Sequence, residues 1–135
     1  MKTKILVDTN VFVYAYDKDS VFHPKAMVFL SDPSVDFYAT TKNLSEFFAV
    51  LFKMGEPFDK VFRFYQDIRQ NTTLLYPDHA SLALFEDLLK KYQPRGNRVY
   101  DMEIVSIALT NGIPEIRTVN VKDFAGVTEM VVSSL

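Results

Sequence analysis

Apolar residues recur along the chain with two spacings, one typical of strands and one typical of helices. Short apolar or alternating runs predict about five strands, at residues 4–7, 36–40, 73–76, 116–119 and 129–134. Apolar positions three or four residues apart predict helices at residues 10–16, 23–31, 43–54, 57–69, 102–111 and in the stretch after Asp78. Residues 93–100 show neither spacing, so we expect a loop there.

Residues at the helix boundaries support this assignment. Pro24 suits the first turn of its helix and Asp78 suits a cap, while Gly55 and Gly112 follow the last helical positions. Strands that alternate with helices predict a parallel sheet covered by helices on both faces. We therefore expect a single α/β domain over residues 1–135, a three-layer α/β/α sandwich around a central parallel sheet.

One charge interrupts the first apolar run, "KILVDTNVFVYA" at residues 4–15. Asp8 follows the first predicted strand directly, and apolar residues resume at Val11. A carboxylate in such a stretch is costly to bury unless a hydrogen bond or an opposite charge balances it. Asp8 is either the cap of the short helix that follows or part of a polar site, and its position alone does not separate the two.

Other polar side chains are predicted to lie at the same edge of the sheet. Ligands bind at the carboxyl ends of the strands in an open parallel sheet, and Asn120 and Asp123 follow the fourth predicted strand. Glu46 lies in the first turns of the helix after the second strand, and Asp101 precedes a helix that leads into the fourth. Taken singly, each acid suits a cap, a turn or an exposed charge. Their joint placement with Asp8 predicts one acidic pocket.

Carboxylates that lie close together repel one another, and a bound cation relieves that repulsion. The chain has no cysteine, and neither His23 nor His79 belongs to a cluster of ligands. Oxygen ligands alone favour Mg²⁺ or Mn²⁺ over zinc. One ion, or a pair about 3.5–4 Å apart, would activate a water molecule for cleavage of a phosphodiester bond.

Charge and hydropathy limit the partners of this chain. The net charge of −2 is not that of a protein that coats nucleic acid, so such a partner requires a local basic patch. Asp8 and Asn10 interrupt any signal-like apolar start, and the run "FFAVLF" is too short to span a bilayer. The absence of cysteine fits a reducing compartment. We expect a cytoplasmic protein with no membrane partner.

Four stretches, in order, resemble the signature of PIN-domain ribonucleases, and most closely the short single-domain toxins of the VapC type. They are "ILVDTNVFVYA", "NLSEFF", "VYDMEIVSIAL" and "TVNVKDF", and together they span Ile5 to Phe124. The resemblance implies a PIN-like fold and an endoribonuclease that uses Mg²⁺ or Mn²⁺. It also implies the toxin of a toxin–antitoxin pair, with a small antitoxin protein as its partner.

The resemblance implies roles for individual residues. The acidic positions that hold the metal and act in catalysis match Asp8, Glu46, Asp101 and Asp123. The small polar positions that support those carboxylates match Thr9, Asn10, Ser45 and Thr118. Asn120 matches a metal-binding position that is Asp or Asn in the family, and it carries one negative charge fewer than the fully acidic version. This departure weakens the case for two tightly held ions.

RNA has to be drawn to an acidic pocket by nearby cations. Arg95 and Arg98 lie in the predicted loop beside the proposed metal, so we expect them to contact phosphate, and Lys42 and Lys122 are weaker candidates. Lysines 90 and 91 end a helix, where cations are favoured in any case. Single-stranded or looped RNA is favoured over a duplex because a flexible backbone can bend onto the metal.

The helices at 43–54 and 57–69 carry more aromatic residues than one buried face can hold. Phe52 and Phe64 fall outside the apolar stripes, which indicates either additional core packing or an exposed surface for a partner. In the resembled toxin family this helical hairpin contributes to a homodimer and to a groove for an antitoxin peptide. We expect the same here.

Two other functions fit parts of the sequence. A PIN-like nuclease outside a toxin–antitoxin pair would process RNA with the same acidic residues. A non-enzyme would be an inactive RNA-binding module or a phospho-receiver. A receiver needs an acidic pair after the first strand and a phosphorylated Asp after the third. Asp8 has no acidic neighbour, and Asp78 is better explained as a helix cap.

Overall fold

The computed structural model describes all residues from Met1 to Leu135. The strands are β1 (Thr3–Val7), β2 (Val35–Thr40), β3 (Thr73–Leu75), β4 (Glu115–Thr118) and β5 (Val131–Ser134). The helices are α1 (Thr9–Tyr16), α2 (His23–Leu30), α3 (Thr41–Lys53), α4 (Phe58–Asn71), α5 (His79–Tyr92) and α6 (Arg98–Thr110), with a 3₁₀ turn η1 (Val121–Phe124). None of the helices combines the length and the hydropathy that a bilayer span requires.

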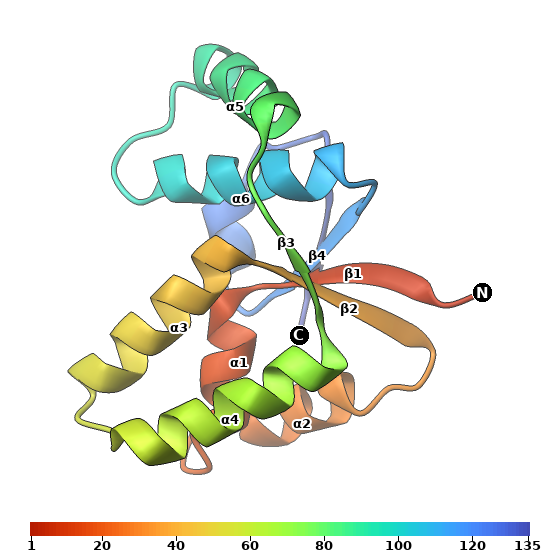
Figure 1. Ribbon diagram of the computed structural model, residues 1–135. Helices are drawn as coiled ribbons and strands as arrows, with labels where there is room; N and C mark the ends of the chain where they lie inside the picture. The colour runs from red at the N-terminus through yellow and green to blue at the C-terminus, as the bar shows by residue number, and fades with distance from the viewer.

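The strands form one sheet in the order β3-β2-β1-β4-β5, and every neighbouring pair is parallel. The central strand is β1, in which Leu6 lies opposite Tyr38 of β2 on one side and Ile116 of β4 on the other. In Figure 1, β1 and β2 run towards the edge of the sheet where α1 and α3 begin. The predicted α/β/α sandwich with a central parallel sheet is therefore confirmed.

Two apolar cores, one on each face of the sheet, hold the helices in place. Ile5 and Val7 of β1 pack with residues of α1, α2, α3 and α4, while Leu6 packs with residues of α5 and α6. Figure 1 shows the same division, with α5 and α6 on one side of the strands and the other helices across from them. The division follows from the strand pleat, because successive side chains point to opposite faces.

Two of the predicted helix-boundary signals act as expected. Asp78 caps α5, since its carboxylate accepts the Ser81 N–H at 2.8 Å and its own N–H donates to the Ser81 hydroxyl at 2.8 Å. Gly112 follows the end of α6 with a φ of 75°, a left-handed conformation that glycine adopts without steric cost. A side-chain cap therefore sets the start of α5, and a glycine sets the end of α6.

The start of α6 corrects the prediction of a loop over residues 93–100. The helix begins at Arg98, so its first turn lies inside the predicted loop. No side chain caps this end, and Arg98 and Tyr100 are both exposed. Asn97 is a favoured N-cap residue, but the turn that follows it has no periodic apolar face, so the sequence does not mark a helix start there.

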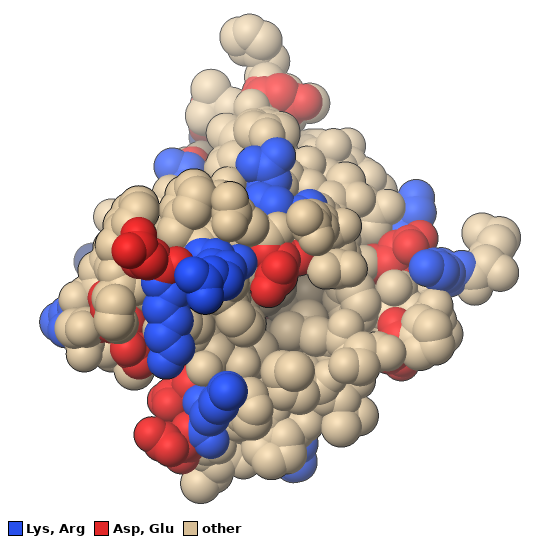
Figure 2. All heavy atoms as spheres, turned by 60° about the horizontal axis from the view of Figure 1, so that its bottom comes forward, with Lys and Arg blue, Asp and Glu red and all other residues tan.

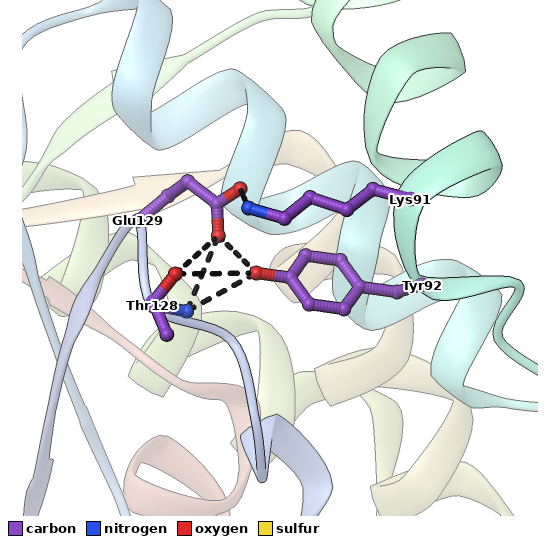
Figure 3. A network of polar contacts seen from close by, with 4 residues as sticks. All are labelled: Lys91, Tyr92, Thr128 and Glu129. Atoms are coloured by element: carbon purple, nitrogen blue, oxygen red, sulfur yellow. Dashed lines mark hydrogen bonds and ion pairs between the residues drawn. The ribbon is translucent and has the colours of Figure 1, made fainter.

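The end of α5 is tied to the chain that leads into β5. Lys91 Nζ lies 2.9 Å from Glu129 Oε2, and the Tyr92 hydroxyl donates to Glu129 Oε1 (Figure 3). The Thr128 N–H donates to the same Oε1 at 3.2 Å. Lys91 and then Tyr92 lower the pKa of Glu129 to about 2. Lys91 therefore forms an ion pair with a carboxylate of the protein itself.

Glu129→Gln is expected to lower the free energy of unfolding at neutral pH, because the side chain loses its charge towards Lys91. A folded pKa of about 2, against an ordinary 4.5, stabilises the fold fully only above the ordinary value. This stability is lost as the pH falls from 4.5 towards 2. Urea unfolding followed by circular dichroism should show a difference in the free energy of unfolding between parent and variant, and this gap should close as the pH falls over this range. Asp87→Asn, an exposed carboxyl on α5, is the control, and a gap that stays constant would contradict the assignment.

Candidate active site at the carboxyl edge of the sheet

Asp8 lies directly after β1, where it is 7% exposed. It is the N-cap of α1, and its Oδ1 accepts the Thr9 N–H at 2.9 Å. Its Oδ2 accepts the Thr118 hydroxyl at 2.8 Å. Each oxygen of the buried carboxylate therefore has a donor, which offsets part of the cost of burial. Asp8 caps a helix and also joins polar groups from another strand, so the two interpretations of this residue are compatible.

Asn10 joins the start of α1 to the end of β4. Its Nδ2 lies 3.3 Å from Thr118 Oγ1 and 3.5 Å from Asp8 Oδ2, and its Oδ1 accepts the Val119 N–H at 3.3 Å. Thr118 Oγ1 also accepts the Asn120 N–H at 3.0 Å. Because β1 and β4 are neighbouring strands, residues from opposite ends of the chain meet in one hydrogen-bond network.

Thr9 and Asn43 connect this network to α3. Asn43 is fully buried and donates through Nδ2 to Thr9 Oγ1 at 3.2 Å, and the Thr9 hydroxyl donates to Glu46 Oε2 at 3.2 Å. Asn43 also forms a capping box with Thr40, the N-cap of α3. Asn43 was not among the predicted site residues. Its signal in the sequence is the Thr-x-x-Asn spacing that starts at the last residue of β2.

All five residues predicted to bind metal line one cavity of about 230 Å³: Asp8, Glu46, Asp101, Asn120 and Asp123. They come from the end of β1, from α3, from the first turns of α6 and from the segment around η1. Thr9 and Asn10 line the same cavity. No three acidic or histidine side chains form a ready-made group of metal ligands. The carboxylates surround a space rather than meeting at one point.

A larger cavity, of about 610 Å³, adjoins the first and shares Glu46, Asp101 and Asp123 with it. Its other lining residues are mostly basic or polar: Lys42, Ser45, Arg95, Asn97, Arg98 and Tyr100. Three of the four predicted RNA-binding cations therefore line this cavity. Lys122 lines neither of the two.

Two of these cations make contacts within the protein. Lys42 Nζ lies 3.5 Å from Glu103 Oε1, which joins α3 to α6 at the rim of the larger cavity. Arg98 donates through Nη2 to the Ala125 carbonyl at 2.9 Å. On the face drawn in Figure 2, basic and acidic side chains occur in small mixed groups rather than as a broad basic surface. For the predicted binding of RNA phosphates, the local arrangement of these cations matters more than the net charge of the chain.

Two residues of the larger cavity, Asn97 and Tyr100, were not predicted. Both lie in the stretch expected to be a loop, and their only signal in the sequence is their closeness to Asp101. Ser45, which was predicted to support the carboxylates, lines the cavity but donates to the Thr41 carbonyl of its own helix at 3.2 Å. Its supporting role stays a prediction.

The acidic groups of this site raise one another's pKa. Burial is the first cause of the raised pKa of Asp8, of Glu46 and of Asp101. For Asp101, the charges of Asp8, Asp123 and Glu46 add to burial and bring its pKa to about 7, while Arg98 acts in the opposite direction. The site thus concentrates negative charge beyond what its own cations balance.

The sequence matches the family model of the PIN domain over residues 5–129. This chain belongs to the PIN-domain family. The match spans all four of the stretches that suggested the resemblance, and it includes every residue of the two cavities described above. No match to the sequence was found among curated proteins.

Solved structures of VapC-type proteins share this PIN-domain fold. VapBC2 from Rickettsia felis, bound to a DNA fragment from its promoter, matches with a TM-score of 0.76 at 16% identity, over 98% of this chain and 99% of that one. VapBC-1 from nontypeable Haemophilus influenzae has a TM-score of 0.71 at 21% identity, over 98% of each chain. VapC20 from Mycobacterium tuberculosis, a sarcin–ricin loop cleaving toxin, has a TM-score of 0.67 at 16% identity, over 83% and 86%. The likeness establishes the common fold.

Asp101→Asn is expected to stabilise the metal-free PIN domain at neutral and alkaline pH. The folded pKa of about 7 lies above the ordinary 3.8, so the parent loses stability as the pH rises between these values. Thermal unfolding in a chelator, followed by circular dichroism, should give the variant the higher Tm well above pH 7, with little difference near the ordinary value. Asp59→Asn, an exposed carboxyl on α4, is the control. A lower Tm for Asp101→Asn in the alkaline range would show that charge repulsion does not dominate there.

Proposed function

We propose that this protein is a metal-dependent endoribonuclease that hydrolyses RNA phosphodiester bonds, and that it is the toxin of a VapBC-type toxin–antitoxin pair in the cytoplasm. The proposal rests on four acidic side chains, from separate parts of the chain, that line one cavity at the carboxyl edge of the sheet. Membership of the PIN-domain family supports the nuclease chemistry. The likeness to VapC-type structures supports the toxin role.

The chemistry of the cavity fits a hard divalent cation. Asp8, Glu46, Asp101 and Asp123 would hold Mg²⁺ or Mn²⁺ through carboxylate oxygens, which these ions prefer. The raised pKa of Asp101 supports this assignment, since a cation relieves the repulsion that causes it. When bound, the ion supplies Lewis-acid stabilisation of the charge that develops on the phosphodiester, and it activates water as the nucleophile.

Asn120 bears on how many ions the site holds. It lines the cavity beside the four acids, where an amide oxygen adds no negative charge. With one carboxylate fewer, a second cation gains less electrostatic stabilisation than the first. We therefore propose one tightly held ion, with any second ion bound more weakly.

The other residues of the site position the acids and the RNA. Thr118 and the Thr9 N–H fix the two oxygens of Asp8, which sets the direction in which this carboxylate faces the cavity. Arg95 and Arg98 line the adjoining cavity, where their guanidinium groups would bind phosphates of the RNA backbone. Lys42 is the weaker third cation at this rim. These side chains would hold the scissile bond against the acidic pocket.

The alternative functions receive less support. The Asp78 carboxylate is used to cap α5, which fits its interpretation as a structural residue rather than a phosphorylated one. A role in RNA processing would use the same active site as a toxin. Expression of the protein by itself separates the two, because a toxin without its antitoxin stops growth and a processing enzyme does not.

An aromatic surface on α3 and α4 supports the proposed protein partners. Its exposed residues are Phe52, Met54, Phe58 and Phe62. The ring of Phe58 stacks between Phe52, at 5.9 Å between centroids, and Phe62, at 5.5 Å. Phe64, by contrast, packs into the core beside Tyr16 and Phe47. We propose that the aromatic surface forms the homodimer and receives the antitoxin.

Asp8→Asn should abolish RNA cleavage while the protein keeps its fold, because Asn still caps a helix but carries no charge for the metal. Thr118→Val should reduce cleavage about 10- to 100-fold, the usual effect of removing a partner of a metal ligand. Initial rates on a labelled single-stranded RNA, with Mg²⁺, with Mn²⁺ and with a chelator, measure both effects. Asp59→Asn, outside both cavities, should cleave like the parent. Parent-like rates for Asp8→Asn would refute the assigned role.

Phe58→Ser is expected to convert the dimer to a monomer, because it replaces the most exposed ring of the aromatic surface, at 60%, with a polar group. Size-exclusion chromatography with light scattering should give the parent about twice the 15.5 kDa chain mass and the variant a single chain mass. Val28→Ser, an exposed apolar position on α2, should stay dimeric. A monomeric parent would disprove this dimer.

A further inference from the structure

Tyr100 stands out among the residues of the larger cavity. It lies in the first turn of α6, directly before Asp101, and it is 56% exposed. It is the one hydrophobic residue among the nine that line this cavity. The remainder of the lining is charged or polar, so the ring is an isolated apolar face in a hydrophilic surface.

The ring of Tyr100 has no partner within the protein. Its hydroxyl takes part in no hydrogen bond, and its ring belongs to no aromatic pair, cation–π contact or apolar core. The exposed rings Phe52, Phe58 and Phe62 differ in this respect, because they stack on one another. Tyr76 also lacks such a partner, but it lines neither cavity, so Tyr100 is the unpartnered ring at the proposed active site.

The surroundings of Tyr100 match the parts of a nucleotide. Arg95, Arg98 and Lys42 line the same cavity and suit phosphates, while Asp101 lies next to Tyr100 and faces the acidic pocket. Proteins that bind single-stranded nucleic acid combine a cationic groove for the backbone with an aromatic ring on which a base stacks. A base in a duplex is already stacked on its neighbours, so such a ring selects unpaired nucleotides.

Resting on the proposed nuclease function, we propose that Tyr100 is a specificity residue that stacks on an unpaired base next to the cleaved phosphate. The substrate is then single-stranded or looped RNA. Sequence preference at this position is weak, because every base has a face on which a ring can stack. A protein partner for the same ring is disfavoured, since the three cations beside it complement phosphates and the aromatic surface lies elsewhere, on α3 and α4.

Binding of a short labelled single-stranded RNA by the Asp8→Asn protein, measured by fluorescence anisotropy, tests the proposal without cleavage. Tyr100→Ala added to this background should raise Kd about five- to tenfold, the lower part of the range for one stacked base. Tyr100→Phe keeps the ring and should bind like the background. Tyr76→Ala removes an equally exposed tyrosine that lines neither cavity, and it should also bind like the background.

Three further measurements separate stacking from charge and from folding. An RNA with a single abasic nucleotide at the stacked position should bind the Tyr100 protein more weakly but bind Tyr100→Ala as the intact RNA does. The slope of log K against log salt should stay the same in Tyr100→Ala, whereas Arg95→Gln should reduce it by about 0.7, the value for one phosphate contact on a single strand. In the active enzyme, Tyr100→Ala should raise KM and leave kcat unchanged.

Several results would overturn the proposal. If the parent cleaves RNA and Tyr100→Ala keeps the parent KM and Kd, the stacking role fails while the nuclease function stands. If Tyr100→Ala binds RNA normally but changes the mass of the assembly in light scattering, the ring belongs to a protein interface. If the parent neither binds nor cleaves RNA, the proposed function fails and the role of Tyr100 fails with it.

Discussion

The buried carboxylate of Asp8 is the group on which the rest of the site depends. A negative charge that is 7% exposed needs hydrogen-bond donors, and two of its three donors, the Thr9 N–H and the Asn10 side-chain amide, are local in the chain. The other is the hydroxyl of Thr118, which reaches Asp8 because β1 pairs with β4 in parallel. The same pairing places Asn10 against the end of β4. The central strand pair that organises the sheet therefore also builds the acidic pocket.

Hydrogen bonds stabilise single carboxylates of the acidic pocket, but the repulsion among the carboxylates destabilises the folded protein. Burial raises the pKa of Asp8, and it outweighs the hydrogen bonds from Thr118 and Thr9 that lower this pKa. The pKa of Asp101 is raised by burial and also by the negative charges around it. Selection for stability alone would remove such repulsion, for example by replacing one acid with an amide. A concentration of charge that costs stability is characteristic of functional sites. The cations at the rim do not remove this repulsion, because they line the adjoining cavity rather than the pocket itself.

Helix α3 links the proposed chemistry to the proposed partner surface. Its first half carries Asn43 and Glu46, which contact Thr9, and its second half carries Phe52 in the aromatic surface. Glu46 and Phe52 are six residues apart in the sequence, which places them about 120° apart around the helix. The two faces of one helix thus serve different contacts, and a partner on the aromatic surface would touch the element that positions Glu46.

The sequence by itself determined the classes of element, the parallel α/β/α architecture and the gathering of Asp8, Glu46, Asp101 and Asp123 at one edge. These follow from local periodicity and from chain direction, because the carboxyl ends of parallel strands meet at the same edge. Only the tertiary structure decided the donors to Asp8, the burial of Asn43 and the early start of α6 that brings Tyr100 to the cavity. Hydrogen bonds between distant segments depend on strand order and register. A pattern of apolar positions shows only which face of one helix or strand is buried, and it does not show which other element lies beside it. The strand order β3-β2-β1-β4-β5 places side by side residues that are far apart in the sequence.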